Sequence, residues 1–325
     1  MTAATDAATT EAGTAPSDIQ PAETERPESR APAIRYAVII PHYNDLTRLR
    51  LCLDSLAPQV AGRDDIEVLV VDNNSPIDMS AVPGAYPWVR LFVEPQKGAG
   101  HARNRGVAEA TADIFLFTDS DCLPTPDWVA RAIQAQRPDT IVGGRMVTFD
   151  ETPGPRSGAE AFETVFAFNQ QHYIKKLNFT VTANAVTTRH VYKTTGGMIF
   201  GPAEDIEWCQ RAVSKGFAVA YDDAMVVKHP TRKDWEALLK KWRRIVDEQF
   251  WTSTQSNGTS LAGRFRWAAK AVVVSLSALV HLPKVFACRE LENMTDKIRA
   301  AGTLVRLRVT RGVWMLRQAM SPTPE

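Results

Sequence analysis

The sequence predicts an α/β fold with a mostly parallel central sheet flanked by helices. Segments rich in Val, Ile, Leu and Phe alternate with segments of helical periodicity, which is the order typical of βαβ units. The segment 114–117 (IFLF) is apolar throughout, as expected of a central parallel strand covered on both faces. With 325 residues, of which 44% are hydrophobic, the chain is long enough to bury one large core or two modest ones.

Four strands are expected in the first half of the folded region. The first strand should stop at Pro41, and the helix that follows, with apolar residues at helical spacing, should stop near Pro58. A glycine-containing loop should lead into another helix before the last of these strands. The four strands are predicted within residues 36–40, 66–72, 89–95 and 113–121.

The second half of the pattern is less regular. A further strand is predicted at residues 140–149. Residues 180–216 are expected to run through strand and loop into a helix near Asp205, and residues 217–230 should supply one or two short strands.

Composition divides the chain into three predicted regions. Residues 1–33 are mainly Ala, Thr, Pro and Glu with almost no large apolar side chains, so we expect a disordered tail. Residues 34–231 carry the α/β pattern. Residues 232–325 are predicted to form a basic helical extension. From Val226 onward, 18 Lys and Arg stand against 8 Asp and Glu, although the formal net charge of the whole chain is only +1.

The extension contains two helical patterns that suggest contact with a membrane surface. Residues 234–251 place large apolar side chains on one helical face and basic side chains mostly on the other. The apolar stretch between Lys270 and Pro283 has about 12 residues, whereas a helix needs ~20 to span a bilayer. With its basic flanks it is predicted to be an interfacial or re-entrant helix. A helix buried within the extension stays open as the alternative.

Several classes of protein are disfavoured by what the sequence lacks. Its four cysteines are far apart and form no CxxC pair, which argues against a zinc site or a disulfide scaffold and fits a reducing cytosol. The N-terminus lacks the basic and apolar regions of a signal peptide, so none is expected. No GxGxxG follows the first strand, which argues against a dinucleotide-dependent oxidoreductase.

Two acids follow the most hydrophobic strand. Asp119 and Asp121 come directly after residues 114–118, and open α/β sheets bind their ligands at the carboxyl ends of the strands. Two carboxylates one residue apart repel each other, and a divalent cation with oxygen ligands removes that repulsion. Because such an ion commonly also holds a phosphate, the pair predicts a metal–diphosphate site. A surface turn is the alternative for an isolated pair of this kind.

The loop at residues 97–106 and the end of the second strand could complete such a site. Glycines such as Gly98 let the backbone approach a ligand, and Arg103 near the following helix start can bind phosphate oxygens. A solvated charged face is the alternative for this loop. Asp72 either accepts a hydrogen bond from a nucleotide base or serves as a turn residue before Asn-Asn-Ser-Pro.

A third group of acids lies at the predicted start of a helix. Glu204, Asp205 and Glu207 crowd three carboxyl groups into four positions. Their mutual repulsion is expected to raise a pKa towards the range of a general base. Acids also stabilise a helix N-terminus, and both interpretations can hold together.

These segments together resemble the family 2 glycosyltransferases of the GT-A fold, from about Tyr36 to Pro230. Five motifs in this order are specific for the fold and the reaction class, and they say little about which sugar is used. The matching motifs are IIPHYND, VLVVDNNSP, KGAGHARNRG, TDSD and GGMIFGPAEDIEWCQR.

The resemblance implies a role for each matching residue. Asp205 would be the general base of an inverting reaction. Asp121, with Asp119, would coordinate Mn²⁺ or Mg²⁺, and Asn104 would support the loop. His229 would contact the metal or the diphosphate, with a surface histidine as the alternative. The nucleotide would be bound by Pro41, Tyr43, Asn44, Asp72, Gly98, Arg103 and Asp119, and the acceptor or sugar by Asn184, Gly197 and Glu204.

The sequence therefore predicts a metal-dependent hexosyltransferase. Its donor would be a nucleotide-diphosphate sugar, expected to be a UDP-sugar, and its acceptor a hydroxyl of a glycan or lipid-linked molecule in envelope polysaccharide or glycolipid assembly. The Gln-x-x-Arg-Trp motif of processive members is missing, so one sugar should be added per encounter. The enzyme is expected in the cytoplasm, peripheral on the cytoplasmic face of the cell membrane and in contact with anionic lipid, with nucleic-acid binding the weaker interpretation of its basic extension.

Two other functions stay open as alternatives. A sugar-phosphate nucleotidylyltransferase would need a glycine-rich loop after the first strand, where this chain has PHYND. A catalytically silent nucleotide-sugar-binding module is opposed by the presence of both the metal acids and the candidate base.

Overall fold

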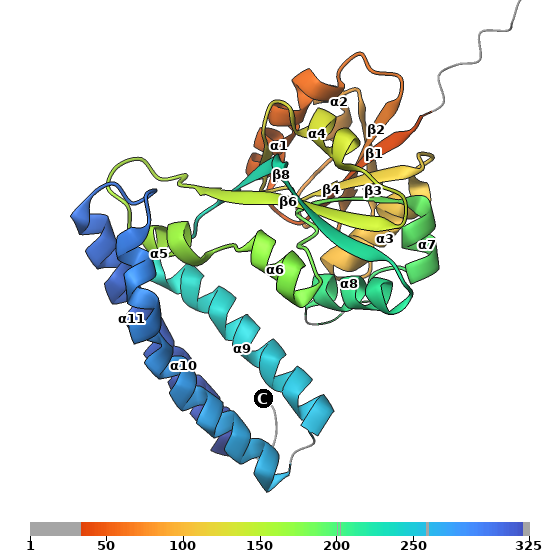
Figure 1. The fold of residues 1–325 in the computed structure, drawn as a ribbon. Helices are drawn as coiled ribbons and strands as arrows, with labels where there is room; N and C mark the ends of the chain where they lie inside the picture. Colours follow the sequence, from red (N-terminus) through yellow and green to blue (C-terminus); the bar gives the residue numbers. More distant parts are fainter. Residues whose placement is uncertain (1–33, 200, 202, 258–259, 321–325) are drawn as a thin grey trace, which may run out of the picture. The chain divides into compact units, whose positions relative to one another are not determined.

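The central element is a mixed, mostly parallel sheet with helices on both sides (Figure 1). The computed structural model describes residues 34–199, 201, 203–257 and 260–320. The predicted tail at 1–33 and two residues of the glycine-rich motif, Phe200 and Pro202, lie outside the described residues. Within them the sheet has eight strands in the order β3-β2-β1-β4-β7-β6-β8-β5.

The first four strands form the parallel half of the sheet, as predicted. β1 pairs in parallel with both β2 and β4, and β2 pairs in parallel with β3. Their carboxyl ends therefore lie along one edge of the sheet. The four strands are β1 (Tyr36–His42), β2 (Ile66–Asp72), β3 (Val89–Val93) and β4 (Ile114–Thr118).

The other half contains antiparallel pairings that the sequence did not indicate. β7 pairs antiparallel with both β4 and β6, and the two-residue β5 pairs antiparallel with β8. β6 and β8 are parallel, with a shift of register between Gly144 and Arg145. These strands are β5 (Leu123–Pro124), β6 (Thr140–Phe149), β7 (Asn184–Thr188) and β8 (Ala218–Pro230).

Eight helices accompany the sheet within the described residues, and three longer ones form the extension. Of the eight, α1, α3 and α8 were predicted, and α2, α4, α5, α6 and α7 were not. The sheet-associated helices are α1 (Leu46–Val60), α2 (Ala81–Ala85), α3 (Ala99–Glu109), α4 (Trp128–Ala135), α5 (Gly158–Phe166), α6 (Gln170–Leu177), α7 (Arg189–Thr195) and α8 (Glu204–Ser214). The extension contains α9 (Trp235–Asn257), α10 (Leu261–Ala287) and α11 (Met294–Met320).

Two elements that were predicted to end at a proline continue through it. β1 continues through Pro41 to His42. The His42 carbonyl accepts from the Asn73 N–H on the β2 side, so the nitrogen of Pro41 faces β4. β4 pairs with β1 only as far as Ile39. Proline has no N–H to donate, but no strand of the sheet pairs with Pro41 on this side, so no hydrogen bond between strands is lost. α1 likewise runs through Pro58 to the end of its last turn.

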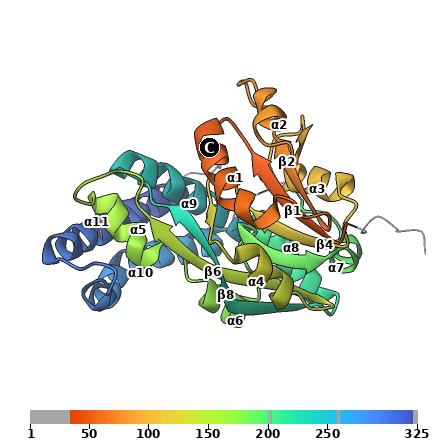
Figure 2. The same cartoon turned by 90° about the horizontal axis from the view of Figure 1, so that it is seen from above.

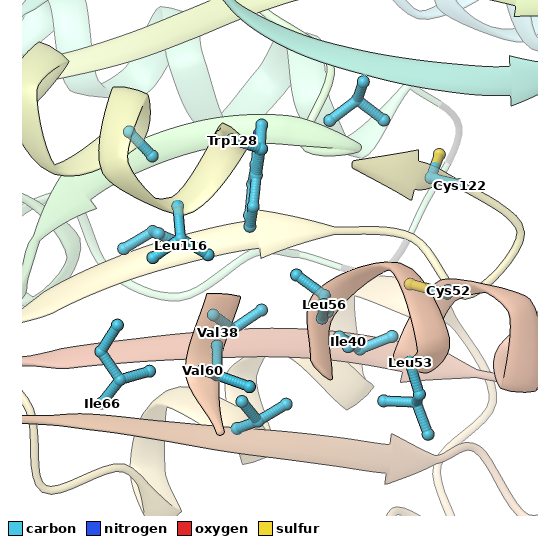
Figure 3. Close-up of a cluster of buried hydrophobic side chains, with 14 of the residues drawn as sticks. Val38, Ile40, Cys52, Leu53, Leu56, Val60, Ile66, Leu116, Cys122 and Trp128 are labelled. Carbon is cyan, nitrogen blue, oxygen red and sulfur yellow. The ribbon is translucent and has the colours of Figure 1, made fainter. Parts of the chain in front are cut away.

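The sheet is apolar on both faces, which explains the continuous hydrophobic strands. Val38 and Leu116 belong to a cluster on one face, while Ile39 and Phe117 belong to a cluster on the other. The first cluster is covered by α1 and α4, whose Leu53, Leu56 and Trp128 pack against the strands (Figure 3). Residues of α3, α7 and α8 complete the second cluster.

The extension packs on α5, and its helices form one antiparallel and one parallel pair. α10 and α11 are antiparallel and lie side by side in both views (Figures 1 and 2), with Arg264 Nε donating to the Ala319 carbonyl at 2.6 Å. α9 runs parallel to α11, because Arg306 and Arg311 lie over the rings of Trp235 and Trp242 in the same order along both helices. A third hydrophobic cluster contains residues of α5, α9, α10 and α11.

A buried ion cluster also ties the extension to α5. The side chain of Glu163 is fully buried and accepts from Lys241 Nζ at 2.8 Å and from Arg232 Nη1 at 3.0 Å. Burial raises the pKa of Glu163, but the two cations outweigh burial and hold the pKa below its usual value. The boundary near residue 231 stays a prediction.

Candidate active site

Arg103 is the centre of the polar site at the carboxyl edge of the parallel strands. Its side chain is buried, and it donates from Nη2 to Asp119 Oδ1 at 2.5 Å and from Nη1 to Glu204 Oε1 at 3.0 Å. Burial lowers its pKa, but Asp119, Asp205 and Glu204 together outweigh burial, so the pKa of Arg103 is raised. Residues from α3, the end of β4 and the start of α8 are thereby joined around one guanidinium.

The acids at the start of α8 carry perturbed pKa values. Burial raises the pKa of Asp205, an effect that Arg103 opposes and that the charge of Asp119 reinforces. Burial likewise raises the pKa of Glu204, with Arg103 opposing and Asp205 reinforcing the shift. Asp205 Oδ1 accepts from the hydroxyl of the buried Thr182 at 2.7 Å, which orients the carboxyl group. Thr182 was not identified as a site residue from the sequence.

Asp121 faces His229 across the edge of the sheet. His229 Nε2 lies 3.6 Å from Asp121 Oδ2, and the ring is mostly buried. The other nitrogen, Nδ1, lies 2.7 Å from the Pro230 carbonyl oxygen, which can only accept, so Nδ1 carries a proton. In the neutral imidazole the lone pair of Nε2 therefore faces a carboxylate. A nitrogen lone pair and a carboxylate oxygen that face each other in this way suit a cation between them.

The donor set fits a divalent cation of the kind the sequence predicted. An imidazole nitrogen and a carboxylate oxygen are both ligands of Mn²⁺, and carboxylate oxygens suit Mg²⁺. Among the described residues no group of three or more His, Cys, Asp or Glu side chains is placed to hold a metal. Asp121 and His229 would therefore supply part of the coordination, and phosphate oxygens of a ligand the rest.

Asp72 belongs to a neighbouring network at the same edge. His42 is buried, and its Nδ1 lies 2.8 Å from Asp72 Oδ1. The Asp45 backbone N–H donates to Nε2 at 3.1 Å, so Nδ1 carries the proton and donates to Asp72. Ser75 donates its backbone N–H to Oδ2 at 2.8 Å. His42 was missed from the sequence, although its place in the IIPHYND motif at a strand end was a usable signal.

The two glycine-containing loops of the site are held by asparagines. Asn73 accepts from the Gly98 N–H at 2.7 Å. Asn104 accepts from the Met198 N–H and donates to the Met198 carbonyl, both at 2.8 Å. A Cβ added at Gly197 would lie 2.8 Å from Asn104 Oδ1, so this close approach needs glycine. Asn104 thus holds the loop that contains Gly197 and Met198, whereas support of its own loop, residues 97–106, stays a prediction.

The remaining predicted nucleotide residues lie beyond the end of β1. Pro41 is the penultimate residue of the strand, Tyr43 is exposed, and Asn44 has a φ of 52° with its N–H donating to the Ser75 hydroxyl at 2.7 Å. An asparagine tolerates this left-handed backbone better than most residues. The three residues thus border the Asp72 network, with the Tyr43 ring facing solvent.

Two residues predicted to contact the acceptor or sugar are engaged within the protein. Asn184 is 0% exposed; its Oδ1 accepts from Trp128 Nε1, and its Nδ2 donates to the carbonyls of Arg145 and Met225. This geometry gives Asn184 a structural role at the β6–β8 bulge, and we do not propose it as an acceptor contact. Glu204 accepts from Arg103 and from the Gly100 N–H, so its first role is to hold α3 against α8.

The fold of this chain also occurs in an enzyme of known structure. It is similar to that of the mannosyltransferase PcManGT from Pyrobaculum calidifontis, whose structure is a complex with GDP-Man and Mn²⁺. The TM-score is 0.50 at 19% identity, and the match covers 92% of this chain and 77% of that chain. At this identity the similarity establishes the fold alone, which is the GT-A fold of glycosyltransferases.

The sequence then identifies the family. Residues 37–196 match the family described as Glycosyl transferase family 2. The chain belongs to the family 2 glycosyltransferases, as the motifs predicted, and it is a glycosyltransferase.

The family assignment is supported by curated relatives, which differ in how far they match. The chain is 28% identical over 219 residues to the glycosyltransferase AglE of Haloferax volcanii, covering 64% of this chain and 70% of that protein. It is 27% identical over 214 residues to the pre-mycofactocin glycosyltransferase of Mycobacterium tuberculosis, covering 62% of this chain but only 44% of that protein.

Proposed function

We propose that this enzyme transfers one sugar per encounter, with inversion, from a nucleotide-diphosphate sugar to a hydroxyl of a glycan or lipid-linked acceptor. The observation that carries the proposal is the charge imbalance at the sheet edge. Asp119, Glu204 and Asp205 surround a single buried cation, Arg103, and Asp121 faces the acceptor nitrogen of His229. A site with this excess of carboxylate suits a ligand that arrives with a divalent cation.

The donor is proposed to lie along the carboxyl edge from β2 to β4. Asp72 would accept from the base N–H through Oδ2, which receives one hydrogen bond from Ser75. Pro41, Tyr43 and Asn44 would border the base, and a UDP-sugar is the proposed donor. Gly98 and Arg103 would lie beside the nucleotide, since the loop that contains Gly98 is fixed by Asn73.

A divalent metal fits the same proposal. Asp121 and His229, helped by Asp119, would hold Mn²⁺ or Mg²⁺. When bound, the ion neutralises the leaving diphosphate without any proton transfer. The complex of PcManGT with GDP-Man and Mn²⁺ supports this choice of cofactor and donor class.

Asp205 is proposed to deprotonate the acceptor hydroxyl as it attacks. A carboxylate within hydrogen-bond reach of the hydroxyl can accept its proton, and a raised pKa makes it a better base. Thr182 fixes one oxygen of Asp205, which leaves the other for the acceptor. Gly197, in the loop held by Asn104, and Glu204 would border the acceptor.

The experiment that tests this function begins with a panel of nucleotide sugars screened for Mn²⁺-dependent hydrolysis or transfer. With the donor identified, Asp205→Asn should reduce turnover about 10²–10⁴-fold while donor affinity stays unchanged. Glu207→Gln is the matched control, because Glu207 lies in the same helical turn but pairs with Arg211 at the surface. Unchanged turnover in Asp205→Asn would remove Asp205 from the mechanism.

The extension is proposed to hold the enzyme on the cytoplasmic face of an anionic membrane. α10 runs through Pro283 as a helix of 27 residues, longer than the predicted 12-residue stretch. By length and composition it is the one helix in the described part of the chain that could cross a membrane, and 17% of its apolar window is buried in the protein. This low burial favours a lipid contact over a core helix. Its exposed apolar residues include Leu261, Phe265, Val272, Val273, Leu276, Leu279, Val280 and Phe286.

Charge selects an anionic surface as the partner of this face. α10 contains four basic residues and no acid, and α11 contains one acid, Asp296, against six basic residues. A second copy of the chain would bring the same positive charge to the contact and be repelled. Each basic residue near an anionic membrane adds ~1 kcal/mol to binding.

Flotation with anionic vesicles tests the membrane contact. Leu276→Asp combined with Val280→Asp should abolish flotation, because both positions lie on the exposed face of α10. Leu51→Asp is the control, since Leu51 is an exposed apolar residue on α1. If the α10 variant floats as well as the wild type, this face does not contact lipid.

A further inference from the structure

Among the described residues, three buried nitrogen donors of α9 and α11 have no hydrogen-bond partner. Arg311 is only 5% exposed, and its Nε is one of these donors. The Nε of Arg308 and the indole Nε1 of Trp242 are the other two. Arg308 and Arg311 are three residues apart on α11, so they share one face of the helix. Trp242 belongs to α9, and its ring lies 4.2 Å from Arg311 Cζ.

No carboxylate compensates these two guanidinium groups in the described part of the chain, where neither forms an ion pair. The two acids that follow Trp242 on α9 are paired elsewhere. Asp247 pairs with Arg243 and accepts from Gln318, and Glu248 pairs with Arg244. An unpaired charge taken out of water is costly, and stacking on an indole offsets only part of that cost.

The charges that shift the pKa values in this cluster are positive. Burial lowers the pKa of Arg311 to about 10, and the neighbouring charge of Arg308 adds to this effect. Burial also lowers the pKa of Arg308. Lys270 of α10 has a pKa lowered by burial and by Arg311. Three cations from two helices thus repel one another, and a bound anion would relieve them all.

We propose that Arg308, Arg311 and Trp242 form a binding site for a phosphate monoester. Two guanidinium forks match the oxygens of a phosphate, and the indole N–H supplies a further donor. A phosphate monoester carries a charge of about −1.5 to −2 at neutral pH, which balances two arginines better than a carboxylate does. The group is carried either by a lipid headgroup or by a soluble molecule. The site lies outside the transfer site and does not depend on the function proposed for it.

Thermal unfolding of the full-length protein tests the site with inorganic phosphate as the probe. The midpoint temperature of the wild type should be higher in phosphate than in chloride at equal ionic strength, because phosphate binds the folded state. Arg311→Met should raise the midpoint in chloride, since an unpaired buried charge is removed, and should abolish the response to phosphate. Arg308→Gln should also abolish the response, which provides a second variant if Arg311→Met fails to fold.

Vesicle binding distinguishes a lipid headgroup from a soluble molecule as the carrier of the phosphate. Phosphatidylcholine vesicles that contain phosphatidic acid present a phosphate monoester. Vesicles that contain phosphatidylserine instead present anionic charge without a phosphate monoester. If a lipid is the ligand, the wild type should prefer phosphatidic acid, and Arg308→Gln should bind it about tenfold or more weakly. A response to free phosphate without this preference would assign a soluble phosphorylated ligand to the site.

Arg317→Gln is the matched control, because Arg317 lies exposed on the same helix. It should keep the response to phosphate and the preference among vesicles. The proposal is overturned if the wild-type midpoint is the same in phosphate and chloride and phosphatidic acid is not preferred. It is also overturned if Arg311→Met folds but has a lower midpoint than the wild type in chloride. Sugar transfer to a soluble acceptor should be unchanged in all these variants, so failure of this site is distinguishable from failure of the transfer site.

Discussion

The sheet edge and the helical extension bury charge of opposite sign. At the sheet edge, Asp119, Glu204 and Asp205 share one buried cation, Arg103, so negative charge is in excess. In the extension, Arg308 and Arg311 have no carboxylate partner among the described residues, so positive charge is in excess. Each region therefore suits a ligand of the opposite sign, which is what we propose for both.

Because the excess charge differs in sign, removing an arginine should change the stability of the protein in opposite directions in the two regions. In the acidic region the single cation compensates several anions, and removing it leaves them all uncompensated. In the basic region each cation adds to the repulsion, and removing one relieves it. The sign of a stability change on losing an arginine therefore reports which region the arginine belongs to.

The largest effect should come from Arg103→Gln. This variant leaves partly buried carboxylates without their buried partner, so we expect the free energy of unfolding to fall by about 3 kcal/mol. Urea denaturation at neutral pH without divalent cations measures it. Arg105→Gln on the same helix is the control, because its pair with Glu109 is partly exposed and worth less than about 1 kcal/mol. Equal effects of the two substitutions would mean that Arg103 does not hold the acidic cluster together.

Much of the acidic site was predictable because its residues follow local rules. Asp72, Asp119 and Asp121 come directly after apolar strands, and the carboxyl ends of parallel strands meet at one edge. The crowding of Glu204 and Asp205 was visible at the start of a helix. The contacts of His42 and Thr182 depend on side chains brought together across long sequence separations, which local patterns do not contain.

The basic region could not be predicted for a related reason. On the sequence, Arg308 and Arg311 belong to a helix rich in basic residues, and such residues usually face solvent. Their burial depends on α9 packing in parallel with α11, which follows from tertiary contacts alone. The antiparallel β7 between β4 and β6 escaped prediction similarly, since strand order in a mixed sheet is not encoded in the pattern of any one strand.

The raised pKa of Asp205 makes the stability of the acidic region depend on pH. Because the pKa of Asp205 is raised in the folded protein, the folded state binds more protons than the unfolded chain between the ordinary and the raised pKa. The free energy of unfolding contributed by Asp205 therefore falls as pH rises through this window. Asp205→Asn removes the contribution, so the variant should gain stability relative to the wild type as pH rises. Urea denaturation at a series of pH values without divalent cations measures the difference.

The ionisation of Asp205 should also affect the pH dependence of kcat/KM. The acid limb of kcat/KM against pH should have an apparent pKa above that of an ordinary aspartate, and Glu207→Gln should leave it in place. A stability difference between Asp205→Asn and the wild type that does not vary with pH would contradict the raised pKa.

The smallest expected effect concerns backbone strain, which also distinguishes the two regions. Ala203, at the N-cap of α8 beside Glu204 and Asp205, has a φ of 58°. A left-handed backbone costs an alanine about 1–2 kcal/mol, whereas glycine adopts it freely. Ala203→Gly should therefore raise the free energy of unfolding by about 0.5–1 kcal/mol after the greater flexibility of glycine in the unfolded chain is counted.

The same substitution in the extension should have the opposite sign. Ala301 lies inside α11, where glycine costs about 0.5–1 kcal/mol relative to alanine, so Ala301→Gly should destabilise the protein. If the strained turn at Ala203 serves to position Asp205, Ala203→Gly should lower turnover while it raises stability, and Ala301→Gly should leave turnover unchanged. A variant at Ala203 that is both more stable and equally active would show that the strain does not serve the placement of the base.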